Sequence, residues 1–296
     1  MSIDAFIPKL WEASLLVPMH EAEVYCQPRV ANRKYEGQIT KAGDAVTVGT
    51  VGKGKVRAYD KASGITIDDL EISTTKLQID QQQYFAFMVE DVDRVQAAGD
   101  IQSAAMEEHA LALTDAAEKD AAAKLAAGAG TKIGDIAVFN GADYYVPAAG
   151  QVSAWDVLRR IRNEMDKKSV AKKGRWCIVG PDFGSALLND KRVTQAEKAG
   201  TREFVMNGEL SSSDLLGFTV MVSSNAPVDK GKETIIAGVE GGFSFANQIV
   251  ETEALRSQTK FGDIVRGLNV WGAAVTSPDR IFTANAQVAA GQLPTK

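Results

Sequence analysis

The 296-residue sequence predicts an α+β protein with one long helix, an extended β-hairpin and an inserted α/β unit. A helical pattern runs from residue 91 to residue 127 with no proline and one glycine. Strand-like segments stand on both sides of it, and helix and strand signals alternate between residues 151 and 227. At 1.5 Å per residue the helix would be about 55 Å long, longer than a small domain is wide. The chain is therefore expected to be flat and extended.

The first two segments are expected to lack a core of their own. Residues 1–36 place apolar anchors such as Trp11 among three prolines, which is typical of an arm that docks on something else. Residues 37–76 carry alternating apolar positions on two limbs around a Gly- and Lys-rich tip, which predicts an extended hairpin. A two-stranded ribbon is marginal in water because it has no second layer. It must lie either on its own domain or on a neighbouring copy.

Residues 77–150 and 228–284 are expected to form one domain around the long helix, which acts as its spine. The apolar stripe of this helix is thin, so it can back a sheet but cannot be buried on all sides. Acidic residues along it, Glu118 among them, are expected to form a solvated face. Residues 129–150 are expected to be a loop with a short strand. The sheet is expected from strand-like segments at residues 77–89, 234–239, 243–250 and 263–274.

Residues 151–227 are expected to form a second, compact α/β domain inserted into the first. Ser153 is suited to cap a helix, because apolar residues follow it at spacings of three and four as far as Met165. A buried strand, a helix and another strand are expected at residues 175–179, 182–189 and 218–222. The last dozen residues, 285–296, are small and polar and predict a loose tail.

Composition and charge exclude several classes of function. The net charge is −5, so the chain has no global basic footprint for nucleic acid. Cys26 and Cys177 are far apart and form no CxxC pattern, so neither a disulfide framework nor a zinc site is indicated. No apolar run approaches the roughly 18 residues of a membrane span, and the N-terminus lacks a signal-peptide pattern.

Two motifs resemble catalytic signatures without their context. Gly49, Gly54 and Lys55 match the spacing of a phosphate-binding loop, but Val56 stands where a Ser or Thr should hold Mg²⁺. Residues 182–184 spell Asp-Phe-Gly without the other kinase motifs, so they are expected to be the first turn of a helix. A basic group between residues 167 and 175 favours a surface loop or an intersubunit contact. His109 is expected to be a lone surface histidine, and Cys177 a buried, inert thiol.

The order of the parts resembles the major capsid protein of tailed bacteriophages, which has the Hong Kong 97 shell fold. Short strings of sequence also resemble that family, at residues 6–12, 32–37, 43–46, 216–220, 224–227 and 265–272. The resemblance implies that residues 1–36 are the N-terminal arm and residues 37–76 the extended loop. It implies a peripheral domain of residues 77–150 and 228–284, and an axial domain of residues 151–227.

The resemblance also implies a structural protein without catalytic residues, cofactor or metal. Such proteins form hexamers and pentamers of an icosahedral shell around double-stranded DNA, without sequence-specific binding and without a membrane. The implied location is the virion capsid, assembled in the cytoplasm of the host bacterium. Because the sequence begins directly at the arm, a separate scaffolding protein is expected. A portal protein and a decoration protein are further candidate partners, and no covalent cross-link between copies is expected.

The expected contacts between copies lie on the arm and the hairpin. Apolar side chains that should face a neighbour are Trp11, Val46, Val48, Ile65 and Ile67. Cationic side chains at the tip that should meet acidic groups are Lys53, Lys55 and Arg57. Two alternatives stay open: an encapsulin-like nanocompartment shell with the same fold, and a nucleotide-binding α/β enzyme that uses the glycine-rich stretch of residues 49–55.

Overall fold

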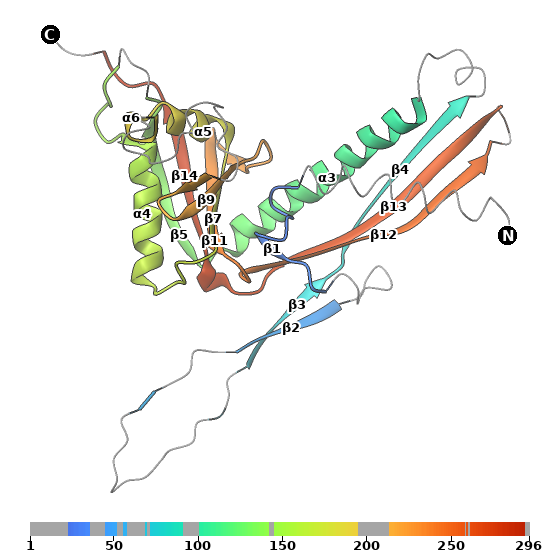
Figure 1. The fold of residues 1–296 in the computed structure, drawn as a ribbon, viewed down its shortest axis with the longest axis horizontal. Coiled ribbons are helices and arrows are strands. Elements are labelled where there is room, and N and C mark those ends of the chain that lie inside the picture. Colours follow the sequence, from blue (N-terminus) through green and yellow to red (C-terminus); the bar gives the residue numbers. More distant parts are fainter. Residues whose placement is uncertain are drawn as a thin grey trace, which may run out of the picture.

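Two sheet-containing bodies lie end to end in the computed structural model, and a two-stranded ribbon projects away from them (Figure 1). A long helix lies along one body and reaches the other, so the molecule is elongated, as expected. The structure describes residues 23–35, 45–51, 56–57, 69, 72–90, 101–141, 145–194, 213–257, 259 and 261–293.

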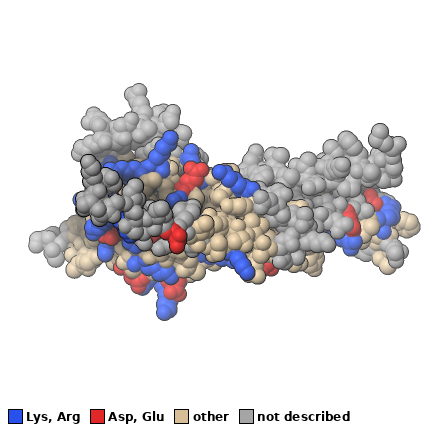
Figure 2. Space-filling view, turned by 90° about the horizontal axis from the view of Figure 1, so that it is seen from below, with Lys and Arg blue, Asp and Glu red and all other residues tan. Residues whose placement is uncertain are grey.

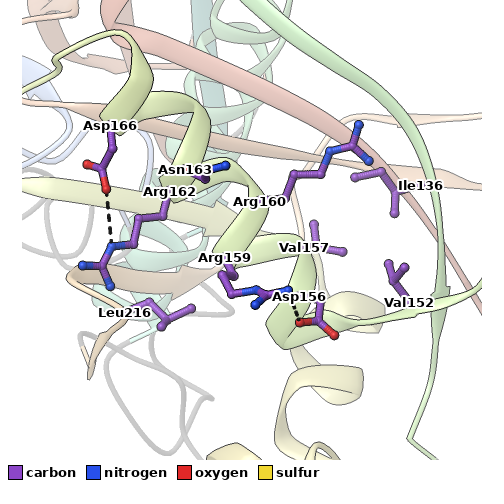
Figure 3. Close-up of a pocket in the computed structure, with 10 residues that line it drawn as sticks. All are labelled: Ile136, Val152, Asp156, Val157, Arg159, Arg160, Arg162, Asn163, Asp166 and Leu216. Carbon is purple, nitrogen blue, oxygen red and sulfur yellow. Dashed lines mark ion pairs between the residues drawn. The ribbon is translucent and has the colours of Figure 1, made fainter.

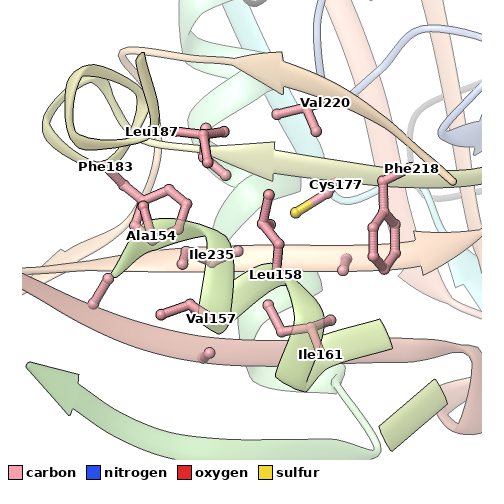
Figure 4. Close-up of a cluster of buried hydrophobic side chains, with 14 of the residues drawn as sticks. Ala154, Val157, Leu158, Ile161, Cys177, Phe183, Leu187, Phe218, Val220 and Ile235 are labelled. Atoms are coloured by element: carbon pink, nitrogen blue, oxygen red, sulfur yellow. The ribbon is translucent and has the colours of Figure 1, made fainter. Parts of the chain in front are cut away.

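An eight-stranded sheet forms the α/β body. Its strands in spatial order are β6 (Val152–Ser153), β5 (Thr131–Phe139), β14 (Ile281–Ala289), β11 (Lys232–Val239), β7 (Arg175–Val179), β9 (Phe218–Val222) and β8 (Ser213–Leu215), and β10 (Val228–Asp229) pairs with β11. The same body holds α4 (Ala154–Lys167), α5 (Pro181–Leu188), α6 (Lys191–Thr194) and the 3-10 turn η3 (Pro278–Arg280). Helices α4 and α5 pack their apolar sides on one face of the sheet and enclose its core (Figure 4).

A four-stranded sheet forms the second body. Its order is β1 (Ala31–Asn32), β12 (Phe243–Arg256), β13 (Gly262–Val275) and β4 (Gln81–Glu90), and the long helix α3 (Ile101–Gly128) lies across one face. The ribbon consists of β2 (Ala45–Val51) and β3 (Ile72–Gln78), which pair antiparallel. Helix α3 ends within one residue of the expected position, whereas the expected start at residue 91 lies outside the described residues.

Helix α4 follows directly from its local sequence. The Ser153 side chain accepts a hydrogen bond from the Asp156 backbone N–H, which satisfies one of the free donors of the first turn. Leu158, Ile161 and Met165 are all buried on the side that faces the sheet. The prediction of this helix and of its cap is confirmed.

The α/β body is larger than residues 151–227, which is a correction to the expected division of the chain. Strands β5, β11 and β14 lie in the same sheet as β7 and β9. Residues 129–150 therefore contain a nine-residue strand rather than only a short one, and the expected tail is a strand as far as Ala289. The reason is that Ala284 and Ala286 are buried in the same core cluster as the apolar side chains of α4 and α5.

The strand expected at residues 77–89 is two strands in two sheets. Strand β3 ends at Gln78 in the ribbon, and β4 begins at Gln81 beside β13. The two residues between them carry the chain from one sheet to the other, and Ile79 is buried at that crossing. The partner strand therefore changes from β2 to β13 where the sequence pattern is continuous.

Candidate intersubunit surfaces

The base of the ribbon is covered by its own molecule. Val48 is only 5% exposed, and it packs with Leu77 and Ile79 against Ala246 and Val270 of the four-stranded sheet. The expectation that Val48 faces a neighbouring copy is therefore wrong. Val46 is half-buried at the edge of the same cluster.

A glycine allows the ribbon to approach the sheet this closely. A Cβ atom at Gly272 of β13 would lie 2.2 Å from the backbone oxygen of Gln78, where the ribbon ends. No real Cβ atom fits at that distance from a backbone atom. The position of the ribbon on the sheet thus depends on the missing side chain of Gly272.

The four-stranded sheet has two unlike faces, because side chains alternate along a strand. On one face Phe85 and Val265 pack against Met106, Ala110 and Leu113 of α3. On the opposite face, no described part of the chain covers Tyr84, which is 78% exposed. In Figure 2, which views the molecule from below, the described side chains in the middle of the molecule are mostly uncharged.

A groove of about 530 Å³ runs along that bare face. Its lining comes from three strands and consists of Tyr84, Ala86, Glu253, Ile264, Arg266, Gly267 and Leu268. The Arg266 Nε donates to a Glu253 carboxylate oxygen at 2.8 Å and so closes one side of the groove. Leu268 also touches the cluster beneath the ribbon, so the groove continues directly from the part of the face that the ribbon covers. We call this surface the sheet groove.

The sequence of β4 contains a signal for the sheet groove. Residues 84–88 of β4 are Tyr-Phe-Ala-Phe-Met, which is apolar on both faces of the strand. A strand of this kind is typical of a sheet that is covered on both sides. Within the described residues, only one side is covered at this strand.

The end of the N-terminal arm is fastened to the long helix by a buried carboxylate. The backbone N–H groups of Val24, Tyr25 and Cys26 donate to Glu118 at 3.0, 2.8 and 2.8 Å. Glu118 is 1% exposed, so the expectation that it lies on a solvated face is wrong. Three successive N–H groups form a site for an anion, and here the helix supplies the anion.

Burial changes the acidity of the groups at this fastening. Desolvation raises the pKa of Glu118 above its ordinary value of 4.5, and the three backbone hydrogen bonds oppose that shift. Desolvation also raises the pKa of the Cys26 thiol, with the Glu118 charge adding to the effect. The thiol therefore stays protonated at neutral pH and behaves as a small apolar group.

Two of the isolated residues have structural explanations. Cys177 is fully buried in β7 and its pKa is raised to about 12 by desolvation, which confirms the expectation of an inert thiol. His109 is half-buried and stacks on Phe85 and Phe87 with ring centroids 5.6 and 4.9 Å apart. It is therefore not the lone surface histidine that the sequence indicated.

The nucleotide-binding alternative fails on geometry at its first glycine. Gly49 lies inside β2, opposite Thr74, and the strand continues to Val51. A phosphate-binding loop requires the chain to leave the strand at that glycine, so that its N–H groups are free to bind phosphate.

In the described ranges, no group of three or more His, Cys, Asp or Glu side chains is arranged to hold a metal. No helix among these residues has the length and apolarity to span a membrane.

Several expected contact residues fall outside the described residues. These are Trp11, Lys53, Lys55, Ile65 and Ile67. Arg57 is described and exposed. All six remain predicted contact residues. The Asp-Phe-Gly triplet, Asp182 to Gly184, lies in the first turn of α5, as expected.

The subunit is elongated, and it has a bare apolar sheet face and a projecting ribbon. These features are typical of structural proteins whose exposed apolar surfaces are covered by other molecules. A family model described as phage capsid protein matches residues 72–284. The chain belongs to this family, whose role is structural. The capsid of a phage virion is therefore its location, and the family match favours this over a bacterial nanocompartment shell.

Solved phage structures share the fold. One described as Mycobacterium phage Che8 is 27% identical, with a TM-score of 0.65 over 86% of this chain and 88% of the other. The capsid of the cyanophage P-SCSP1u is 15% identical, with a TM-score of 0.63 over 85% of each chain. The mature capsid of bacteriophage PhiM1 is 13% identical, with a TM-score of 0.60 over 82% of each. No curated protein matches the chain.

Proposed function

We propose that this chain is the major capsid protein of a tailed phage and that copies of it assemble into hexamers and pentamers of an icosahedral shell. The observation that carries the proposal is the sheet groove, an apolar surface that the described chain leaves bare. Apolar surface gains free energy when it leaves water, at roughly 25 cal/mol per Å². A second copy that covers the groove would gain this free energy at every contact of the lattice.

The two bodies have different roles in this proposal. The α/β body would be the axial domain near the centre of each capsomer, and the four-stranded sheet with α3 would be the peripheral domain. The projecting ribbon would lie across a neighbouring copy with its tip residues Lys53, Lys55 and Arg57. The shell would enclose double-stranded DNA, and it would assemble in the host cytoplasm with a separate scaffolding protein and a portal. Closed shells of one correct size from the chain expressed alone would refute the need for a scaffold.

Replacing Tyr84 by aspartate should lower the yield of assembled particles at least tenfold. Burial of a side chain of this size contributes about 2 kcal/mol per contact, and about 1.4 kcal/mol corresponds to a factor of ten. Particle yield is measured by sedimentation and electron microscopy of purified protein. Gln83→Asp is the matched control, because it places the same charge on the same strand and the opposite face.

The control separates loss of the groove from loss of the strand. Tyr84→Asp should leave the circular dichroism spectrum and the midpoint of urea unfolding of the unassembled chain unchanged. Gln83→Asp should assemble as the wild type does. Normal assembly of Tyr84→Asp would contradict the proposed role of the sheet groove.

A further inference from the structure

Basic residues are concentrated in one short part of the chain. Residues 154–175 carry eight Lys and Arg against three Asp and Glu, whereas the rest of the chain carries 25 against 35. A protein of net charge −5 therefore has one strongly basic segment and an acidic remainder. Two copies of such a chain are complementary in charge when the basic segment of one meets the remainder of the other.

The basic side chains line a groove on the outer side of α4. Its charged and polar lining residues are Asp156, Arg159, Arg160, Arg162, Asn163 and Asp166, and its apolar ones are Ile136, Val152, Val157 and Leu216. Figure 3 shows Arg160 on the side of Ile136 and Arg162 on the opposite side of α4, toward Leu216. Its volume is about 790 Å³. Arg175, which the sequence grouped with this basic segment, is only 4% exposed and does not contribute to the surface. We call the surface the arginine groove.

Asp156 and Asp166 line the arginine groove together with its three arginines, which leaves a surplus of positive charge. Asp166 lies 3.8 Å from Arg162, but it is held more closely by the buried Arg175 at 2.7 Å. Asp156 lies 3.3 Å from Arg159 and is shared with Arg192 at 3.4 Å.

Arg160 forms no ion pair with any residue that the structure describes. The charge of Arg160 does act on Glu164, where it helps to lower the pKa of that carboxyl, but Glu164 is paired with Lys167 at 2.8 Å. Each of the three acids near the arginines therefore already has another cationic partner. The arginines of the groove thus outnumber the carboxylates that line it.

We propose that the arginine groove binds an acidic surface of a second copy within the capsomer. This proposal rests on the proposed function, and it identifies one surface that would join neighbouring copies into the ring of a pentamer or hexamer. Two arginine grooves cannot face each other across a two-fold axis, because like charges would be opposed. A basic surface against a different, acidic one is a heterologous contact, and such contacts close into rings when the rotation allows it.

The double charge reversal Arg159→Glu, Arg160→Glu tests the proposal. We expect at least a tenfold loss of pentamers and hexamers, measured by sedimentation velocity of the purified protein at about 0.15 M salt. Charges at the surface are partly screened at this ionic strength, so the milder change Arg159→Gln, Arg160→Gln should lose fewer capsomers. Capsomers of the wild type should dissociate more readily as salt is raised.

Lys172→Glu, Lys173→Glu is the matched control, because both lysines are exposed and lie outside the arginine groove. It makes the same change in net charge and should reduce capsomers less than threefold. An unchanged midpoint of urea unfolding in all variants excludes misfolding. Normal capsomers from the Arg159→Glu, Arg160→Glu variant would overturn the proposal.

Two further outcomes identify what failed. If capsomers and shells of the variant form normally but retain less DNA, the arginine groove binds nucleic acid and the proposal is wrong. If Tyr84→Asp blocks assembly while the arginine variants assemble normally, the proposed function stands and only the arginine groove is excluded.

Discussion

Replacing Glu118 by alanine is expected to lower the free energy of unfolding by about 3–5 kcal/mol. The substitution leaves the N–H groups of Val24, Tyr25 and Cys26 without an acceptor, and Tyr25 and Cys26 are fully buried. Each buried donor without a partner costs about 1–3 kcal/mol, partly offset where water enters. The loss is measured by urea unfolding of the unassembled chain.

Glu108→Ala is the control, because Glu108 lies on the same helix and is exposed. It should change the free energy of unfolding by less than about 0.5 kcal/mol. A loss of similar size in both variants would show that helix propensity, rather than the fastening of the arm, is responsible.

The pH dependence of stability should also change at Glu118. Its pKa is raised in the folded chain, so the folded state binds this proton more readily than the unfolded state does. Stability from this group is therefore fully present below its ordinary pKa of 4.5 and is lost as pH rises through its folded pKa. Glu118→Gln does not titrate. The stability of the wild type relative to this variant should increase as pH falls through that window, and a constant difference would contradict the expected raised pKa.

Replacing Gly272 by alanine should displace the ribbon and lower the free energy of unfolding by about 1–3 kcal/mol, the usual cost of overpacking. The new Cβ would overlap the backbone oxygen of Gln78, so the base of the ribbon must move away from the sheet. The yield of particles should fall as well, because the ribbon would project in another direction. Urea unfolding and electron microscopy measure the two effects.

Gly49→Ala makes the same chemical change in the ribbon itself. A Cβ there would meet only Ile72 at 3.7 Å, which is an ordinary contact. We expect this variant to assemble normally and to unfold close to the wild type. Equal damage from both glycines would show that flexibility, and not the close approach at Gly272, controls the ribbon.

Elements with strong local signals could be predicted from the sequence. Helix α4 has a capping serine and a regular apolar stripe, and β7 and β9 are short apolar runs between breakers. Their positions depend on interactions between near neighbours in the chain. The order of the elements was also sufficient to indicate the family.

Features that depend on distant partners were missed. Strand β14 continues through Ala284 and Ala286. Their small side chains are typical of a loose tail in the sequence, and only their packing against α4 and α5 explains why they are buried in a strand. Glu118 has the same local pattern as its exposed neighbours, and only the arm, more than 90 residues away, accounts for its burial. The pairing of Asp166 with the buried Arg175 likewise could not be read from the basic run.

The fastened arm has a mechanical consequence. Tyr25 and Val30 lie in one apolar cluster with Leu125 of α3, Trp176 of the α/β body and Trp271 of the other sheet. This part of the arm is thus packed between the two bodies and is in contact with both of them. Because Tyr25 and Val30 contact both bodies in this cluster, a change in the angle between the bodies must also displace this segment of the arm.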